Sequence, residues 1–327
     1  MSAASLPTQI LDDINDAAAR LKRGQLVAFP TETVYGLGAN ALDPLAVARI
    51  FEAKQRPSFD PLIVHVADVQ CISEVAVDLP DPGQLLADKF WPGPMTLVLP
   101  RTSQIPDLVT SGLPGVGVRI PQHPIARQLL AAAAIPVAAP SANPFGGVSP
   151  TTVQHVSEGL DGRIDAILDG GPCSIGLEST VISLMDDDPV VLRLGGLSIE
   201  DIEKVIGAVS IAEADPERQD AAQAAPGMLS RHYAPKTPIV LCDVEAQIEP
   251  TSPQDALLTW GPRRKHDEQF AFQKRLSEAS DLAECAANFF AALRSLDAHN
   301  PRAIIARRFP DHGLGRALND RLNRAAN

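Results

Sequence analysis

The fold of this 327-residue chain is set by residues 25–38, which read QLVAFPTETVYGLG. The apolar run 25–30 predicts a short buried strand, and a polar turn follows it directly. Two threonine hydroxyls and a carboxylate therefore stand where the chain leaves the predicted sheet, and two glycines let the backbone approach a ligand closely. Ligands of open α/β sheets bind at such strand ends. Taken alone, the segment also fits a hydrogen-bonded polar turn that binds nothing.

Strands and helices alternate on both sides of this segment. Apolar spacing predicts helices at 44–54, 125–134, 151–159 and 199–206, and strands at 62–66, 96–99, 116–120, 135–139, 166–168, 179–184 and 190–194. Many of these strands are joined by connections too short to hold a helix. We therefore expect an α/β fold with a mixed, twisted sheet rather than a purely parallel one.

A change in composition after residue 207 predicts a domain boundary. Residues 208–237 are rich in Ala, Gln, Asp, Glu and Pro and keep no apolar period, which is typical of a linker. Its phrase PGMLSRHYAP at 226–235 is too specific for a passive spacer. Strands at 239–242, 256–260 and 303–306, with helices at 281–296 and 314–325, predict a small Rossmann-like α/β domain over 238–327, after a first domain over 1–207.

Composition narrows the class of protein. Four cysteines without a CxxC pair argue against a zinc site or a disulfide framework and fit a reducing compartment. No apolar run approaches the length of about 20 residues that spans a bilayer, and the first twenty residues show no signal peptide, so we expect a soluble cytoplasmic protein. The net charge is −12, and residues 1–207 hold 13 Lys/Arg against 24 Asp/Glu. Such an acidic body repels polyanions, so tight direct tRNA binding is not expected.

Familiar nucleotide and hydrolase motifs are absent. The sequence has no GxxxxGK[ST] loop, no GxGxxG after a strand, no GxSxG and no HExxH. Polar residues instead gather after predicted strands and helices. Lys54 and Arg56 close a helix ahead of a stiff proline-containing loop, which suits a phosphate clamp but also a helix dipole. His65 lies in an apolar strand, where a hydrogen-bonded core role is equally consistent.

Later segments add a buried cation and more hydroxyls. Arg119 stands in an apolar strand and must find an anion, either a protein carboxylate or a ligand. Ser141, Asn143 and Ser149 follow another apolar strand beside two glycines, whose amides can face a phosphate. Glu178-Ser-Thr180 and Arg193 complete the polar set of the last strands.

These segments together resemble the YrdC-type threonylcarbamoyl-AMP synthase family. The resemblance rests on PTETVYGLG, KxR at Lys54 and Arg56, PLIVHV, FWPGPMT, GVRIP, SxN at Ser141 and Asn143, GLESTV and LRLGG, and on PGMLSRHYAPKTP of the two-domain form. It spans about residues 10–240. It implies a sheet bent around a positively lined cavity and an enzyme that makes L-threonylcarbamoyladenylate from ATP, L-threonine and bicarbonate. Pyrophosphate leaves, and the product passes to the tRNA threonylcarbamoyl-transferase machinery.

The resemblance also implies a role for individual residues. Lys54 and Arg56 would be catalytic, with Mg²⁺ held mainly by the ATP phosphates and no metal ligands identified. The L-threonine and bicarbonate residues would be Thr31, Thr33, His65, Arg119, Ala139 and Ser179. The ATP residues would be Lys54, Arg56, Asp60, Gly115, Ser141, Asn143, Ser149, Arg193, His232 and Tyr233, the last closing over the site. Position 60 is often Asn in this family, and an aspartate there repels phosphate unless a cation, Mg²⁺ or the ribose meets it.

Two alternatives stay open on sequence alone. One is a carbamoyl-adenylate enzyme acting on another carbamoyl donor, although the zinc-finger segments usual in that group are not seen here. The other is an RNA-binding module that uses a positive cavity for backbone phosphates. The acidic balance and an aromatic content of 4% count against it.

Overall fold

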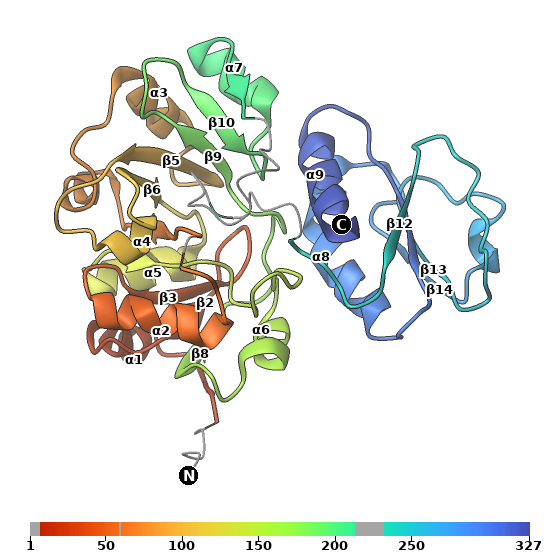
Figure 1. Cartoon of the computed structure of the whole chain (residues 1–327), viewed down its shortest axis with the longest axis horizontal. Helices are drawn as coiled ribbons and strands as arrows, with labels where there is room; N and C mark the ends of the chain where they lie inside the picture. Colours follow the sequence, from red (N-terminus) through yellow and green to blue (C-terminus); the bar gives the residue numbers. More distant parts are fainter. Residues whose placement is uncertain (1–6, 59, 213–225, 227–231) are drawn as a thin grey trace.

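The computed structural model describes residues 7–58, 60–212, 226 and 232–327. Figure 1 shows a large body that carries one end of the chain and a small body that carries the other. The large body contains β1 (Gln9–Leu11), α1 (Ile14–Lys22), β2 (Val27–Phe29), β3 (Gly36–Asn40), α2 (Pro44–Lys54), β4 (Ile63–His65), η1 (Val69–Glu74), α3 (Asp81–Phe90), β5 (Met95–Pro100), α4 (Asp107–Thr110), β6 (Gly115–Arg119), α5 (Pro124–Ala133), β7 (Val137–Ala138), α6 (Val153–Leu160), β8 (Ala166–Leu168), β9 (Thr180–Ser183), β10 (Val190–Arg193), α7 (Ile199–Ile206) and β11 (Ser210–Ile211).

The large sheet mixes parallel and antiparallel pairs, as expected. Its strand order is β1-β8-β2-β3-β7-β4-β6-β5-β9-β10-β11. Pairs such as β2 with β8 and β4 with β6 are parallel, whereas β2 with β3 and β5 with β6 are antiparallel. The prediction of a mixed α/β sheet is confirmed.

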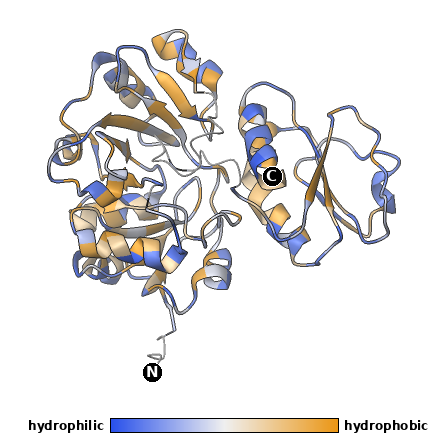
Figure 2. Cartoon of the chain, viewed as in Figure 1, coloured by the Kyte–Doolittle hydropathy of each residue, from blue (hydrophilic) through white to orange (hydrophobic). Residues whose placement is uncertain are grey.

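Alternation along the strands fills a core on each face of this sheet. In β2, Val27 and Phe29 face the apolar cluster that contains α1 and α5, while Ala28 faces the cluster that contains α2, α3, α6 and α7. Figure 2 shows apolar residues concentrated on the strands, with hydrophilic residues on the outer helix faces. Side chains of β4, β6 and β10 (Ile63, His65, Arg119 and Arg193) line a cavity of this body.

The small body is a parallel sheet with two helices packed on one face. It contains β12 (Ile239–Cys242), β13 (Ala256–Thr259), η3 (Asp267–Gln269), β14 (Phe272–Arg275), α8 (Leu282–Asp297), β15 (Ile304–Arg307) and α9 (Leu314–Ala326). The strand order is β12-β15-β13-β14, and all its pairs are parallel. Figure 1 shows α8 and α9 standing between this sheet and the large body.

The two bodies share an apolar cluster. Val34, Val148 and Leu177 of the large body belong to one cluster with the two phenylalanines of α8, Phe289 and Phe290. Gly176 has a φ of +72°, and a Cβ there would lie 2.4 Å from the main-chain oxygen of an alanine in α8. Only glycine therefore lets the loop before residue 178 lie directly against α8.

Most predicted elements are present with small shifts at their ends. The helices 44–54 and 199–206 have the predicted bounds, with Asp43 and Ser198 accepting hydrogen bonds as N-caps. The structure corrects the turn predicted after residue 30, because residues 36–40 form β3. It adds β1, α1, α3, α4 and β14, which the sequence did not predict. It also places β11 inside the segment predicted as a linker. The linker residues 213–225 and 227–231 lie outside the described residues, and the domain boundaries stay a prediction.

Candidate active site

A cavity opens at the ends of the central strands of the large sheet. Its walls come from the strands and turns of that sheet and from the segment that joins the two bodies. They are formed by Thr31, Thr33, Val34, Gly36, Arg56, Ile63, His65, Arg119, Ala139, Pro140, Ser141, Glu178, Ser179, Arg193, Pro226, His232 and Tyr233.

The cavity brings together most of the residues expected at the site. All six residues predicted for threonine and bicarbonate line it, as do five of the residues predicted for ATP: Arg56, Ser141, Arg193, His232 and Tyr233. Lys54, Asp60, Asn143 and Ser149 are buried behind its wall. Gly115 instead lines a neighbouring cavity that shares Ile63 and Pro226 with the first. Their roles as ligand-binding residues stay predictions.

Arg119 is held at the floor of the cavity by the turn that follows β2. Its Nη2 lies 2.6 Å from Glu32 Oε1, and its Nη1 donates to Thr33 Oγ1 at 2.8 Å. Thr33 and Thr31 exchange a hydrogen bond of 2.8 Å between their hydroxyls. The anion that the sequence required for Arg119 is thus a protein carboxylate, which orients the guanidinium toward the cavity.

His65 lies beside Arg119 because the β4–β6 register pairs these two residues. Neighbouring residues in register point to the same face of a sheet. Burial, helped by the positive charge of Arg119, lowers the pKa of His65 to about 3. The imidazole is therefore neutral at physiological pH. It can exchange hydrogen bonds with a ligand but is too weakly basic to take up a proton.

The opposite wall is organised by Arg193 at the end of β10. Its Nη2 donates to the main-chain oxygen of Ser179 at 2.8 Å and lies 3.2 Å from the Ser179 hydroxyl, which also pairs with Thr96 Oγ1 at 2.8 Å. Its Nη1 donates to the main-chain oxygen of Pro226 at 2.8 Å, so the joining segment contacts the cavity directly. Burial lowers the pKa of Arg193.

The Lys54 side chain hydrogen-bonds to the main chain and is not among the residues that line the cavity. Its Nζ donates to the main-chain oxygens of Ser141 and Asn143, each at 2.5 Å. Burial, reinforced by the neighbouring charge of Arg56, lowers the pKa of Lys54 well below its usual value. The side chain thereby fixes the polar turn that carries the predicted SxN residues.

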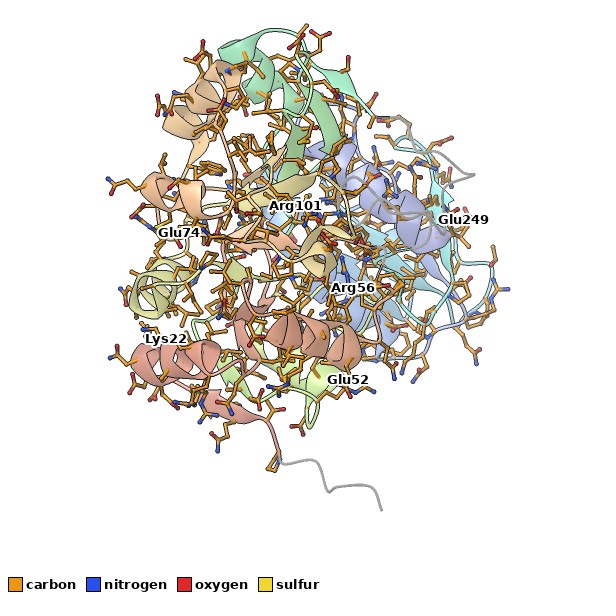
Figure 3. All side chains as sticks on the ribbon, turned by 60° about the vertical axis from the view of Figure 1, so that its left-hand side comes forward. Lys22, Glu52, Arg56, Glu74, Arg101 and Glu249 are labelled. Atoms are coloured by element: carbon orange, nitrogen blue, oxygen red, sulfur yellow. The ribbon has the colours of Figure 1, made fainter. Side chains whose placement is uncertain are left out.

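Arg56 lies near the middle of the view in Figure 3, where the two bodies overlap, whereas Lys22 and Glu249 lie at its periphery. Its Nη2 is 2.9 Å from Asp60 Oδ2, and it donates further to the main-chain oxygens of residues 60 and 61. Burial lowers the pKa of Arg56, and the carboxylate of Asp60 opposes this shift. The negative charge of Asp60 is therefore compensated by a protein cation.

Tyr233 and His232 close one side of the cavity. Tyr233 has a φ of +62°, which is uncommon for a large side chain and indicates that its surroundings hold it in place. Its ring stacks on Phe290 at 5.7 Å, and the His232 ring lies 4.1 Å away. Burial and the cations around the cavity lower the pKa of His232 well below its usual value.

Two carboxylates of the site were not assigned a role from the sequence. Glu32 orients Arg119, and Glu178 accepts from the Ser149 hydroxyl at 2.5 Å and from Arg321 Nε at 2.8 Å. Arg321 belongs to α9, whose sequence places it among Leu318, Leu322 and other apolar residues. An arginine on the apolar face of a helix was the available signal.

Within the described residues, no group of three or more His, Cys, Asp or Glu side chains gathers in a way that could hold a metal ion. The carboxylates nearest the cavity, Glu32, Asp60 and Glu178, are each paired with an arginine. Across the same described residues, no helix is both long and apolar enough to cross a membrane.

Comparisons with known proteins agree with this geometry. Residues 19–195 match the Sua5/YciO/YrdC family model, described as "Telomere recombination", and residues 197–327 match a model described as "Threonylcarbamoyl-AMP synthase, C-terminal domain". The first match alone covers more than half of the chain. The chain belongs to this family.

Two relatives of this family member, both named threonylcarbamoyl-AMP synthase, come from Pyrococcus abyssi and Bacillus subtilis. Each is 43% identical to it over 96% of the chain, and the matches cover 94% and 92% of their own lengths. The solved structure of P. abyssi Sua5 complexed with L-threonine is 40% identical, with a TM-score of 0.85 over 98% of this chain and 97% of that one. The family resemblance, the fold class and the assignment to the threonylcarbamoyl-AMP synthases are confirmed.

Proposed function

We propose that the chain joins L-threonine, bicarbonate and ATP into L-threonylcarbamoyladenylate, with release of pyrophosphate and water. The observation that supports this proposal is one cavity lined by two sets of polar side chains. We assign Arg119, His65 and the threonine hydroxyls to one end of it, and Arg56 and Arg193 to the other. An amino acid and a nucleotide are two anionic substrates that must meet in one place.

The Arg119 end suits an amino acid. The two Nη groups of Arg119 that contact Glu32 and Thr33 each carry a second N–H, and a substrate carboxylate is the partner this fork recognises. Neutral His65 adds no further positive charge, so a threonine amine can lose its proton next to it. The complex of P. abyssi Sua5 with L-threonine supports an amino-acid site in this family.

The Arg56 and Arg193 end suits the nucleotide. Arg56 and Arg193 would neutralise phosphate charge, and Lys54 would act by holding the turn of Ser141 and Asn143. His232 and Tyr233 would cover the adenylate from the joining segment. Mg²⁺ would enter as part of the MgATP substrate, because the described carboxylates of the site are taken up by arginines.

Positioning would account for the chemistry. The threonine amine attacks the carbon of bicarbonate, and water leaves as the carbamate forms. A carbamate oxygen then attacks the α-phosphorus, and the bond to the pyrophosphate leaving group breaks. A carbamate decarboxylates readily in water, so the cover formed by residues 226 and 232–233 would protect it. Neither step requires a covalent protein nucleophile.

The product would then serve tRNA modification in the cytoplasm. An activated carbamate can acylate an adenosine amine, and a separate tRNA threonylcarbamoyl-transferase would carry out that step. The acidic balance of the chain argues that tRNA itself is bound weakly. Nanomolar tRNA binding at physiological salt would instead favour the RNA-binding alternative.

A pyrophosphate-release assay tests the proposal. Release should require both bicarbonate and L-threonine, and L-serine should give less. Arg119→Met should abolish release, because the carboxylate contact is lost. Arg127→Met, at an exposed position of α5, is the matched control and should keep full activity. Release that continues without an amino acid or without bicarbonate would show that the proposed reaction is wrong.

A further inference from the structure

The small body sends one fully buried arginine toward the cavity. Arg321 in α9 has no exposed surface, and its Nε and Nη2 bond to the large body. Nε lies 2.8 Å from Glu178 Oε2, and Nη2 donates to the main-chain oxygen of Leu194 at 2.8 Å. The guanidinium also lies 4.8 Å from the centre of the Tyr233 ring. Two residues of the cavity wall therefore depend on one side chain of α9.

Glu178 extends this contact to the predicted nucleotide residues. While Oε2 binds Arg321, its other oxygen accepts a hydrogen bond of 2.5 Å from the Ser149 hydroxyl. Glu178 is buried and lines the cavity together with Arg56 and Arg193. Arg321 thus holds a carboxylate that would otherwise carry an uncompensated negative charge beside the place expected for the phosphates.

Burial alone would lower the pKa of Arg321, but the attractions of Tyr233, Glu178 and Asp320 raise it above its ordinary value. The guanidinium therefore stays charged in spite of its burial. The two bodies do not need the charge of Arg321 to stay packed together, because an apolar cluster and contacts at the surface already join them. Among these contacts, Arg316, from the same helix, lies 3.8 Å from Glu200 of α7.

We propose that Arg321 is a positioning residue for the nucleotide end of the cavity. It neutralises Glu178, fixes Ser149 through that carboxylate, and supports the ring of Tyr233. The small body is then part of the substrate site, not an appended domain. The inference rests on the proposed function, since the charge of Glu178 matters most when a polyphosphate lies beside it.

Variants of the full-length chain distinguish a role of Arg321 in ATP binding from a role in holding the two bodies together. Arg321→Met keeps the length of the side chain but removes the charge and leaves Glu178 unpaired. The Kd for ATP, measured by calorimetry, and the KM for ATP should each rise by tenfold or more, while the KM for threonine should change less than twofold. Arg316→Met is the matched control, because it also removes a contact between α9 and the large body, and it should stay within twofold of wild type.

A second substitution tests the cause. Adding Glu178→Gln to Arg321→Met removes the unpaired negative charge, so it should recover at least threefold of the lost ATP affinity. A merely structural arginine predicts no recovery. If Arg321→Met does not fold, Arg321→Lys gives a complementary test, because it keeps the charge opposite Glu178 and loses only the hydrogen-bonding fork of the guanidinium. Its loss of ATP affinity should be partial and should not improve on adding Glu178→Gln.

The results distinguish this inference from the proposed function. If the wild-type chain binds no ATP, the proposed function itself fails. If wild type binds ATP and Arg321→Met binds it equally well, only the role of Arg321 is refuted. Equal effects of Arg321→Met and Arg316→Met, or a double variant no better than the single one, would also refute it.

Discussion

Replacement of Lys54 by methionine tests whether this lysine organises the site through the main chain. The Lys54 ammonium is 1% exposed and donates to the carbonyl oxygens of Ser141 and Asn143. Methionine fills a similar volume but leaves both carbonyls without this donor. The Ser141 oxygen still accepts from the Asn143 main-chain amide at 3.0 Å, so one carbonyl is left unsatisfied, at a cost of about 1–3 kcal/mol. Because stability totals only about 5–15 kcal/mol, this loss is large.

Thermal denaturation and hydrogen exchange would measure the effect. The Tm should fall by about 2–12 °C, since about 1 kcal/mol shifts a domain of this size by about 2–4 °C. Amides of residues 141–147 should exchange faster, because the turn loses its anchor. The matched control is Lys89→Met, which removes an exposed lysine from the last turn of α3, just as Lys54 ends α2. A Tm within 1 °C of wild type, with unchanged exchange over 141–147, would refute the reasoning.

Three further predictions follow from the charges of the site. In the folded chain His65 has a pKa of about 3, whereas in the unfolded chain it has its ordinary pKa of about 6.5. Protons therefore bind the unfolded chain more strongly, and the folded state loses stability as the pH falls below about 6.5. This proton binding should lower the free energy of unfolding by about 2 kcal/mol at pH 5. Urea unfolding at pH 7.5 and at pH 5 should show a smaller loss of stability at pH 5 in His65→Asn than in wild type, and equal losses would contradict this. Glu32→Gln leaves Arg119 buried without its carboxylate and should cost about 3–5 kcal/mol in urea unfolding, and a cost below about 1 kcal/mol would show that the pair is not needed. Asp60→Asn removes a negative charge from Arg56 and should lower the KM for ATP roughly three- to tenfold in the pyrophosphate assay, whereas an unchanged or higher KM would count against a phosphate near Arg56.

Local sequence signals predicted the elements that have clear ends. The helix 44–54 starts with an aspartate cap and a proline, and the helix 199–206 starts with a serine cap, so both bounds were read correctly. β3 was missed because its sequence, Gly-Leu-Gly-Ala-Asn, has little strand propensity; it forms because β2 and β7 pair with it on both sides. Tertiary pairing of this kind leaves no trace in a short window of sequence.

At the site, too, local sequence signals pointed to some residues, whereas contacts between distant segments could not be predicted. Arg119 could be found because a cation in an apolar strand requires a partner, but its partner, Glu32, lies 87 positions away and was not identifiable from sequence. The role of Lys54 as a phosphate ligand stays a prediction, and the structure adds its bond to the main chain, a contact with no sequence motif. Arg321 was missed because nothing in α9 tells which residue of the large body it faces.

The order of the large sheet has a consequence for synthesis of the chain. Val27 of β2 pairs with Ala166 of β8, a residue that lies 139 positions later. At about 5–20 residues per second, the ribosome needs about 7–28 s to make that partner. During this interval the apolar residues of β2 have no strand on one side and no finished core around them. Nascent chains should therefore depend on chaperones and be prone to aggregation when translation is faster than chaperone binding.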